Sequence, residues 1–393
     1  MNSFALHAGS LFDGFTASGP ATVYITGDRI VRVDRTGALP SDGSSVIDLG
    51  SRSCLLPGLI DSHTHLAFDA GPDPVTSLAA TDDTDLLTHM RAAARSALHA
   101  GITTIRDLGD RDYLSLALVE ELAQHPEQGP EILTSGPPLT TRGGHGHFFG
   151  GEVEGPEALR AAVRERHRRG CAVVKIMASG GNLTPGSVPP HASQYSFEDL
   201  RAVVDEAHRL GLPVAAHAHG LQAINDALRA GVDSLEHVSF LTPDGVGSDP
   251  ALLDAIVESG SFVSLTLGWD RRVAVELPKA IAAHLEEILT VFRDLHKLGA
   301  KIVIGSDAGI APDKPHNVLP HGVGDLARLG VPPLDALISV TGMAARLCRM
   351  EGRKGQITAG ADADLLAVNG NPSQDPAALL DVRAVFRAGV RVR

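Results

Sequence analysis

The sequence is poor in several features that define broad classes of protein. It has only three cysteines in 393 residues, Cys54, Cys171 and Cys348, and no two of them form a CxxC pair. An odd number of isolated cysteines excludes a disulfide framework and a zinc knuckle, and it favours a reducing compartment. Uninterrupted apolar runs of 18 residues are also lacking, so we expect no membrane-spanning helix. The opening MNSFALHAGSLFDGF has no basic region followed by a sustained apolar stretch, so we expect no signal peptide and a cytoplasmic protein.

Positive charge is scarce as well. The 34 Lys and Arg residues face 47 Asp and Glu residues, which gives a net charge of −13. This balance removes the general attraction that a phosphate backbone requires, so we expect no nucleic-acid partner. The lack of a long apolar run gives the expectation of no membrane partner. Hydrophobic residues make up 43% and charged residues 21%, as in globular proteins. The length exceeds what one hydrophobic core usually serves, which predicts a large domain with a smaller one, or two domains.

What the sequence does contain, from residue 59 onward, is a regular alternation of strand-like and helical segments. Each strand-like run is rich in apolar or β-branched residues, and helical sequence follows it. Such βα alternation predicts a parallel sheet, and eight units favour a closed (β/α)8 TIM-like barrel over an open sheet. The eight runs are GLIDSHTHL, ITTIRDLG, EILTSG, AVVKIMASGG, VAAHAHG, SLEHVSF, FVSLTL and KIVIGSDAG.

Both ends of the chain consist of strand-like segments without the intervening helical segments of this middle part. Residues 21–34 hold two alternating runs around Gly27-Asp28, which predicts a β-hairpin. Near the C-terminus, GQITAGADADLLAVNGNP and VRAVFRAGVRVR also read as strands. We therefore predict a small β-sandwich domain built from residues 1–57 and 355–393, with the barrel of residues 58–354 inserted between them. Two unrelated terminal hairpins are the alternative.

Chemically active residues gather at the ends of the predicted strands. In a parallel barrel these ends meet in one mouth, so side chains far apart in the chain come together there. His63 and His65 stand two residues apart on a strand and so share a face, where both can bind one metal ion. Each of the other residues has a plain structural reading, as a core histidine, a snorkelling lysine or a helix cap, but their joint occurrence is specific. These others are Lys175, His217, His219, His237 and Asp307.

These motifs resemble the amidohydrolase superfamily of metal-dependent hydrolases. PGLIDSHTHL is similar to its first-strand signature, and GQITAGADADLLAV is similar to the segment that returns to its β-sandwich. Within it, VKIMASGG, AAHAHG and RGGHGHFFGG most resemble the imidazolonepropionase-like branch that includes Xaa-Pro dipeptidases. The resemblance spans essentially the whole chain, and it also implies a homo-oligomer.

The resemblance further implies a centre with two divalent metal ions. Zn2+ suits the expected nitrogen and oxygen ligands, although manganese and cobalt are tolerated as well. Asp307 would also act as the catalytic proton carrier. For the strand that holds His217 and His219 we favour His217, which matches the family pattern. The resemblance implies that His63, His65 and Asp307 bind the first metal and that His217 and His237 bind the second. Lys175, carboxylated on its amine by carbon dioxide, would bridge the two metals.

The function implied is hydrolysis of an amide bond in a small peptide or N-acyl amino acid. An Xaa-Pro dipeptidase or carboxypeptidase fits best, and trimming of a modified peptide in natural-product biosynthesis uses the same chemistry. Lys175 disfavours the mononuclear alternatives, a cyclic-amide hydrolase or a deaminase of the same fold, and the full ligand set disfavours a non-catalytic scaffold.

Several residues near the predicted mouth are candidates for binding the substrate. A cation and two imidazoles in the loop RGGHGHFFGG could hold a carboxylate or an oxyanion. A flexible glycine-rich connector with solvated histidines is the alternative for this loop. The candidates are Arg142, His145, His147, Tyr195 and His219.

Overall fold

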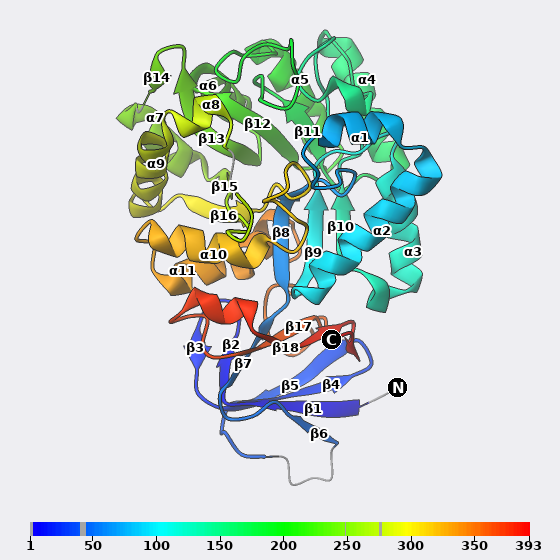
Figure 1. Ribbon diagram of the computed structural model, residues 1–393, viewed down its shortest axis with the longest axis vertical. Helices are drawn as coiled ribbons and strands as arrows, with labels where there is room; N and C mark the ends of the chain where they lie inside the picture. The colour runs from blue at the N-terminus through cyan, green and yellow to red at the C-terminus, as the bar shows by residue number, and fades with distance from the viewer. Residues whose placement is uncertain (1–2, 40–44, 248, 275–276) are drawn as a thin grey trace.

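The larger part of the structure, which is a computed structural model, is built on parallel strands (Figure 1). The structure describes residues 3–39, 45–247, 249–274 and 277–393. Among these residues, all eight predicted strands are present. β10, β9 and β8 form one sheet, and β11, β12, β13, β15 and β16 form another, with β14 (Gly245–Val246) paired to β13. Isolated parallel bridges from Thr64 to Ala308 and from Leu139 to Ile176 link the two sheets. The arrangement is a TIM-barrel-like α/β fold. The eight strands are β8 (Leu59–Thr64), β9 (Ile102–Asp107), β10 (Glu131–Thr134), β11 (Val174–Met177), β12 (Val214–Gly220), β13 (Ser234–Thr242), β15 (Phe262–Thr266) and β16 (Lys301–Gly305).

Helices surround these strands (Figure 1). Their ends follow local sequence signals: Ser196 and Asp199 form a reciprocal capping box at the start of α5, and the basic last turn of α4 is followed by its C-cap, Gly170, with φ 92°. The helices are α1 (Pro74–Ala80), α2 (Asp83–His99), α3 (Leu114–Gln124), α4 (Pro156–Arg169), α5 (Phe197–Arg209), α6 (Leu221–Ala230), α7 (Pro250–Ser259), α8 (Lys279–Ala282), α9 (Leu285–Lys297), α10 (Leu319–Arg328), α11 (Pro333–Ile338) and α12 (Gly342–Leu347). Short 3-10 turns cover Pro126–Gln128, His147–Phe149 and Pro376–Leu380.

The two ends of the chain form two further sheets, at the lower end of Figure 1, and strands from both ends meet in the second of them. One sheet has the order β5-β4-β1-β6, and the other has the order β19-β18-β17-β7-β2-β3. The hairpin predicted around Gly27 is present as the antiparallel pair β4 and β5. Leu11, Ile25 and Phe386 belong to one buried cluster, so the two chain ends share a hydrophobic core. The strands are β1 (Ser3–Ala8), β2 (Ser10–Phe12), β3 (Ala17–Ser18), β4 (Ala21–Thr26), β5 (Arg29–Asp34), β6 (Val46–Asp48), β7 (Ser53–Pro57), β17 (Leu365–Asn369), β18 (Val382–Arg387) and β19 (Val390–Arg391).

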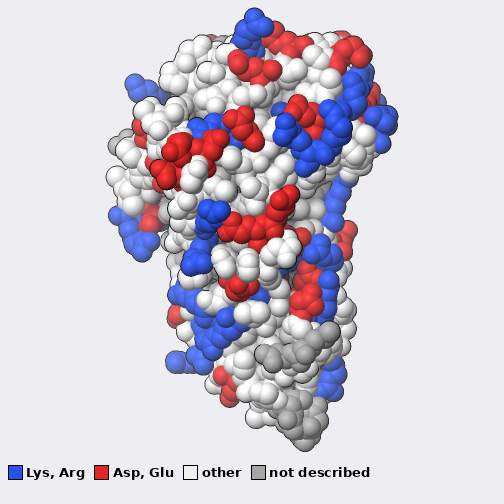
Figure 2. All heavy atoms as spheres, turned by 90° about the vertical axis from the view of Figure 1, so that its right-hand side faces the viewer, with Lys and Arg blue, Asp and Glu red and all other residues white. Residues whose placement is uncertain are grey.

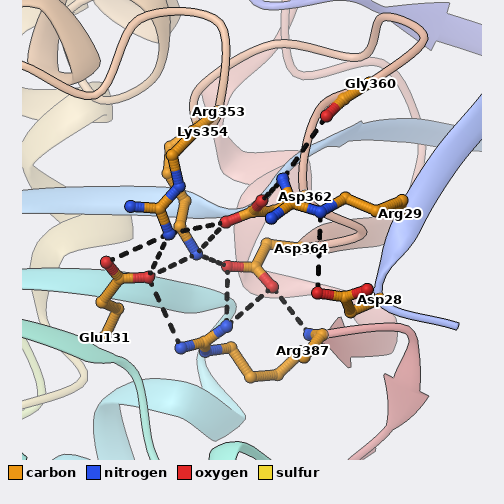
Figure 3. A network of polar contacts seen from close by, with 10 residues as sticks. Asp28, Arg29, Glu131, Arg353, Lys354, Gly360, Asp362, Asp364 and Arg387 are labelled. Atoms are coloured by element: carbon orange, nitrogen blue, oxygen red, sulfur yellow. Dashed lines mark hydrogen bonds and ion pairs between the residues drawn. The ribbon is translucent and has the colours of Figure 1, made fainter. Parts of the chain in front are cut away.

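A network of ion pairs joins the parallel strands to the terminal sheets (Figure 3). At its centre the ammonium of Lys354, only 1% exposed, pairs with Glu131 on β10 at 3.0 Å and with Asp362 at 3.1 Å. It also pairs with Asp364, which accepts a hydrogen bond from Arg387 at 3.1 Å. Buried charges are stable only when such partners surround them, so this network fixes the junction between the two parts.

The molecular surface mixes charges of both signs. On the face shown in Figure 2, basic and acidic side chains lie interspersed. Arg91 pairs with Glu121 at 2.8 Å, and Arg169 on α4 pairs with Glu165 at 3.0 Å. Within the described residues, the helices lack the combination of length and apolar character that crossing a membrane requires.

Candidate metal centre

The metal-binding residue types at the strand ends converge as two clusters. The first consists of His63, His65 and Asp307, and the second consists of His217, His219 and His237. In each cluster, one ligand atom from every residue lies within 4.8 Å of the others, and all the residues are buried. Three or more nitrogen and oxygen donors at this spacing suit a divalent metal ion.

The first cluster brings together residues at the ends of the first and the last of the eight parallel strands, β8 and β16. The Nε2 atoms of His63 and His65 lie 3.6 Å and 3.4 Å from Oδ1 of Asp307. His63 Nε2 is buried and has no hydrogen-bond partner among the described residues. Burial, with the neighbouring Lys175 ammonium, lowers the pKa of His63 to about 4, so this imidazole is neutral near pH 7 and its lone pair is available to a metal.

Two of the proposed ligands occupy strained backbone positions. His237 has φ 71° and Asp307 has φ 55°, in the left-handed region that side chains other than glycine rarely adopt. At His237 this left-handed backbone conformation interrupts the alternation of side chains along the strand, so the side chains of Glu236 and His237 both face the interior. Strain of this kind persists where the surrounding structure enforces it, and it concentrates at functional sites.

Lys175 lies on β11 and lines the same cavity as both clusters. Its side chain is 1% exposed, and its Nζ atom has no hydrogen-bond partner among the described residues. Burial lowers the pKa of this amine to about 8. A lysine amine without a hydrogen-bond partner is costly to bury as a cation, so simple packing does not explain its position. Nζ of Lys175 and Nε2 of His63, which lack hydrogen-bond partners among the described residues, are chemically suited to a metal centre together with the other histidines and Asp307.

Both histidines of β12 belong to the second cluster. His217 donates from Nε2 to the carbonyl oxygen of Gly180 at 3.0 Å, which leaves Nδ1 for a metal. His219 Nδ1 lies 2.9 Å from the hydroxyl of Ser239, which leaves Nε2. Burial lowers the pKa of both, to about 4 for His219. Either imidazole is therefore available as a neutral donor, and His217 as the ligand stays a prediction.

A buried charge pair behind His63 escaped the sequence analysis. Oε2 of Glu236 lies 2.9 Å from Nδ1 of His63, and Oε1 accepts a hydrogen bond from Arg106 at 2.7 Å. Although burial raises the pKa of Glu236, the Arg106 guanidinium and the His63 contact bring it below the ordinary value. The carboxylate therefore accepts a hydrogen bond from Nδ1–H of His63 and leaves the lone pair of Nε2 free for a metal. In the sequence, only the position of Glu236 directly before the predicted ligand His237 pointed to a carboxylate near the site.

The residues predicted to bind substrate divide into two groups. His145 and His219 line the cavity that contains the metal-binding clusters, whereas Arg142, His147 and Tyr195 are not part of its lining. His145 is 6% exposed, and burial together with nearby His219 lowers its pKa to about 3. The Tyr195 hydroxyl donates to the carbonyl of Val153 at 2.8 Å, as a structural tyrosine does. The roles of all five in substrate binding stay predictions.

Comparison with known proteins places the chain in a family. The amidohydrolase family model matches residues 54–392. Ochratoxinase from Aspergillus niger is 30% identical over 361 residues, which cover 84% of this chain and 73% of that protein. The crystal structure of a Xaa-Pro dipeptidase with methionine bound in its active site matches with a TM-score of 0.87 at 27% identity, over 99% of both chains. That of a prolidase complexed with N-methylphosphonate-L-proline matches with a TM-score of 0.85 at 28% identity, over 100% of both.

The chain therefore belongs to the amidohydrolase family. It is a hydrolytic enzyme that acts on C–N bonds, in a family whose members are generally metal-dependent.

Proposed function

We propose that this enzyme is a binuclear metal-dependent amidohydrolase that cleaves the amide bond of a small peptide or N-acyl amino acid, in the manner of an Xaa-Pro dipeptidase or carboxypeptidase. The observation that carries the proposal is the buried, unpartnered amine of Lys175 beside two clusters of metal-binding residues. The likeness to a Xaa-Pro dipeptidase and a prolidase supports a peptide substrate. Trimming of a modified peptide would use the same centre.

The proposed ligands divide between two metals. His63, His65 and Asp307 would hold the first, His217 and His237 would hold the second, and Lys175, carboxylated to a carbamate, would bridge them. Zn2+ suits this donor set. When bound, the two metals would make a water molecule nucleophilic near neutral pH and polarise the scissile carbonyl.

The protein residues then position the reactants and move the proton. Asp307 carries a carboxylate between His63 and His65, where it can accept the proton of the attacking water and deliver it to the leaving amine. Thr266 lies 3.1 Å from Nδ1 of His237, and this contact fixes the orientation of that imidazole.

The parallel strands and the terminal sheets supply the frame for this site. We propose that residues 58–354 form a closed (β/α)8 barrel, since parallel bridges link the edges of its two sheets. Residues 1–57 and 355–393 would form the composite β-sandwich, which is supported by their shared buried core. The site then lies at the carboxyl ends of the barrel strands, where TIM-barrel enzymes carry their chemistry.

A hydrolysis assay tests the proposal. Protein loaded with Zn2+ is incubated with a mixed library of dipeptides and N-acyl amino acids, and the released amino acids are identified by mass spectrometry. We expect release that stops with a chelator and with Asp307→Ala. Metal-loaded protein that releases no amino acid from the library, but opens a cyclic amide or deaminates a ring, would overturn the peptidase assignment.

A further inference from the structure

The loop that follows β16, residues 309–316, carries two polar side chains into the interior. Lys314 is 5% exposed and His316 is 7% exposed. Neither belongs to the two metal-binding clusters. The loop is folded back on itself by a hydrogen bond of 2.8 Å from the backbone nitrogen of Gly309 to the carbonyl oxygen of Lys314. Buried polar side chains are normally explained by their hydrogen bonds, so the partners of these two indicate what the loop does.

Lys314 connects two neighbouring strands beyond the point where their ladder ends. β15 and β16 pair in parallel as far as Thr266 and Gly305. Nζ of Lys314 donates to the carbonyl oxygen of Thr266 at 3.1 Å and to that of Ser306 at 2.9 Å. The same atom lies 4.5 Å from the centroid of the Trp269 ring, which further restricts the ammonium. One side chain therefore holds the carboxyl ends of both strands together.

Each of these two carbonyls belongs to a segment that positions a residue of a different cluster. Thr266 also places its hydroxyl 3.1 Å from Nδ1 of His237, which belongs to the second cluster. Ser306 immediately precedes Asp307, which belongs to the first cluster and whose backbone adopts φ 55°. A backbone in this region stays in place only where neighbouring contacts enforce it. Lys314 is therefore linked to both clusters through a single intervening residue on each side.

His316 holds the backbone of a third proposed ligand. Its Nε2 lies 3.1 Å from the carbonyl oxygen of His65, and because a carbonyl only accepts hydrogen bonds, the imidazole donates. Gly309 packs against the same carbonyl: a methyl carbon there would lie 2.5 Å from the His65 oxygen and 3.1 Å from Nε2 of His316. The loop therefore fits closely against the backbone of His65 and leaves no space for a side chain at Gly309.

We propose that Lys314 and His316 are positioning residues of the metal centre. Lys314 fixes the backbone around Thr266 and Asp307. His316 fixes the backbone of His65, so that the loop sets the geometry in which both clusters bind metal. This inference rests on the proposed binuclear centre and extends it to residues that bind no metal themselves. The alternative is that these contacts only hold the loop and the strand ends in place, with no effect on metal binding.

Replacement of Lys314 by methionine tests the first of these roles, because methionine has a similar length but no hydrogen-bond donor. The affinity for Co2+ is measured by titration against a competing chelator, and the ligand geometry is followed by the visible absorption of the bound Co2+. We expect Lys314→Met to weaken the binding of both ions about tenfold or more and to alter the absorption. Losses of this size are typical when the outer hydrogen-bond partners of a metal site are removed.

Lys301→Met is the matched control for this substitution. Lys301 begins the same strand at its other end, donates to the carbonyl oxygen of Gly260 at 2.8 Å and lies 5.4 Å from the centroid of the Phe262 ring. It therefore makes the same kinds of contact as Lys314, but away from the metal-binding clusters. This variant should keep the Co2+ affinity and the absorption of the wild type. A folded Lys314→Met protein that also keeps both would overturn the role of Lys314.

A double-mutant cycle separates this role from a general loss of stability. Thr266→Val removes the contact with His237 but keeps the carbonyl that Lys314 holds. If Lys314 acts on the second cluster through Thr266, the loss of Co2+ affinity in the double variant should be clearly smaller than the two single losses combined. Losses that add in full would show independent effects and would contradict the proposal. Lys314→Gln, which keeps an N–H donor on a shorter side chain, takes the place of Lys314→Met in the cycle if the latter does not fold.

The His316 contact is tested by a loss and its rescue. His316→Leu should weaken the binding of at least one Co2+ ion about tenfold. His316→Gln should restore the affinity, since the amide nitrogen of glutamine can donate to the same carbonyl oxygen. Equal affinity in all three proteins, or an equal loss in both variants, would contradict the role of His316.

The outcomes separate this inference from the function on which it rests. If the wild type binds fewer than two Co2+ ions per chain, the proposed binuclear centre fails. If it binds two and releases amino acids from the library, while the variants at Lys314 and His316 bind Co2+ as the wild type does, the proposed function stands and the positioning role is wrong.

Discussion

Replacing Glu236 by glutamine isolates the contribution of one buried charge to the metal centre. The carboxylate contacts His63 Nδ1 at 2.9 Å, Arg106 at 2.7 Å and the hydroxyl of Ser234 at 2.5 Å. All of these partners lie in the interior. A glutamine keeps the shape of the side chain but has only one acceptor oxygen. It therefore cannot accept from both His63 and Arg106 with separate oxygens, and one of these donors faces an NH2 group.

Two effects of known size follow from this change. Loss of the negative charge leaves the Arg106 guanidinium buried without its partner, which costs about 3 kcal/mol or more of unfolding free energy. Loss of the defined proton on His63 Nδ1 weakens this imidazole as a ligand through Nε2. Removal of such an outer hydrogen-bond partner lowers metal affinity by about 10- to 100-fold.

Metal content and unfolding provide the assays. The bound metal is measured by elemental analysis after dialysis against graded chelator, and the unfolding free energy is measured with denaturant. Glu121→Gln is the control, because it breaks an Arg–Glu pair on the surface, where such pairs are worth about 0–1 kcal/mol. A folded Glu236→Gln variant with the metal affinity of the wild type would refute the reasoning.

Three further predictions concern the junction and the packing behind the centre. Lys354→Met should lower the unfolding free energy by about 3–5 kcal/mol, measured in denaturant, because it removes the buried cation that pairs with Glu131, Asp362 and Asp364 and leaves only Arg387 to pair with Asp364; a change under 1 kcal/mol would contradict the network. Burial raises the pKa of Asp364, but Lys354 and Arg387 together bring it below 3.8, so the stability that this carboxylate contributes is present above pH 3.8 and is lost as the pH falls further. The unfolding free energy, measured from pH 6 to pH 2, should therefore fall less in Lys354→Met than in the wild type. Parallel curves for the two proteins would argue against this role. Gly305→Ala should displace His63 and lower metal content, because the added methyl carbon would lie 2.2 Å from its Cβ, whereas Gly19→Ala meets nothing within 4 Å and serves as the control.

Much of the fold could be predicted from the sequence because the signals were local and repeated. Each of the eight strands has its own apolar run, and each run is bounded by turn residues, so the strand order followed directly. The spacing of His63 and His65 likewise indicated a shared face from the two-residue period of a strand. The structure places both in one cluster with Asp307.

The parts that could not be predicted depend on contacts between distant segments. The two-residue period alone would put Glu236 and His237 on opposite faces, and only the turn at φ 71° brings both inward. Arg106 reads as an ordinary strand residue until β9 and β13 are placed together. The apolar residues of α9 read as core packing, because the sequence does not show that Leu289 faces a cavity instead of a neighbouring helix.

The proposed binuclear centre depends most on Lys175 as the bridge between two metals. Metal analysis should find two equivalents of Zn2+ per chain in the wild type, and protein prepared with 13C-bicarbonate should show a carbamate carbon signal by NMR. Both the signal and the full metal content should be lost in Lys175→Met, and a short carboxylic acid supplied in solution to Lys175→Ala should restore part of the metal binding. A single metal per chain in the wild type, or two metals retained in Lys175→Met without a carbamate signal, would contradict the binuclear centre.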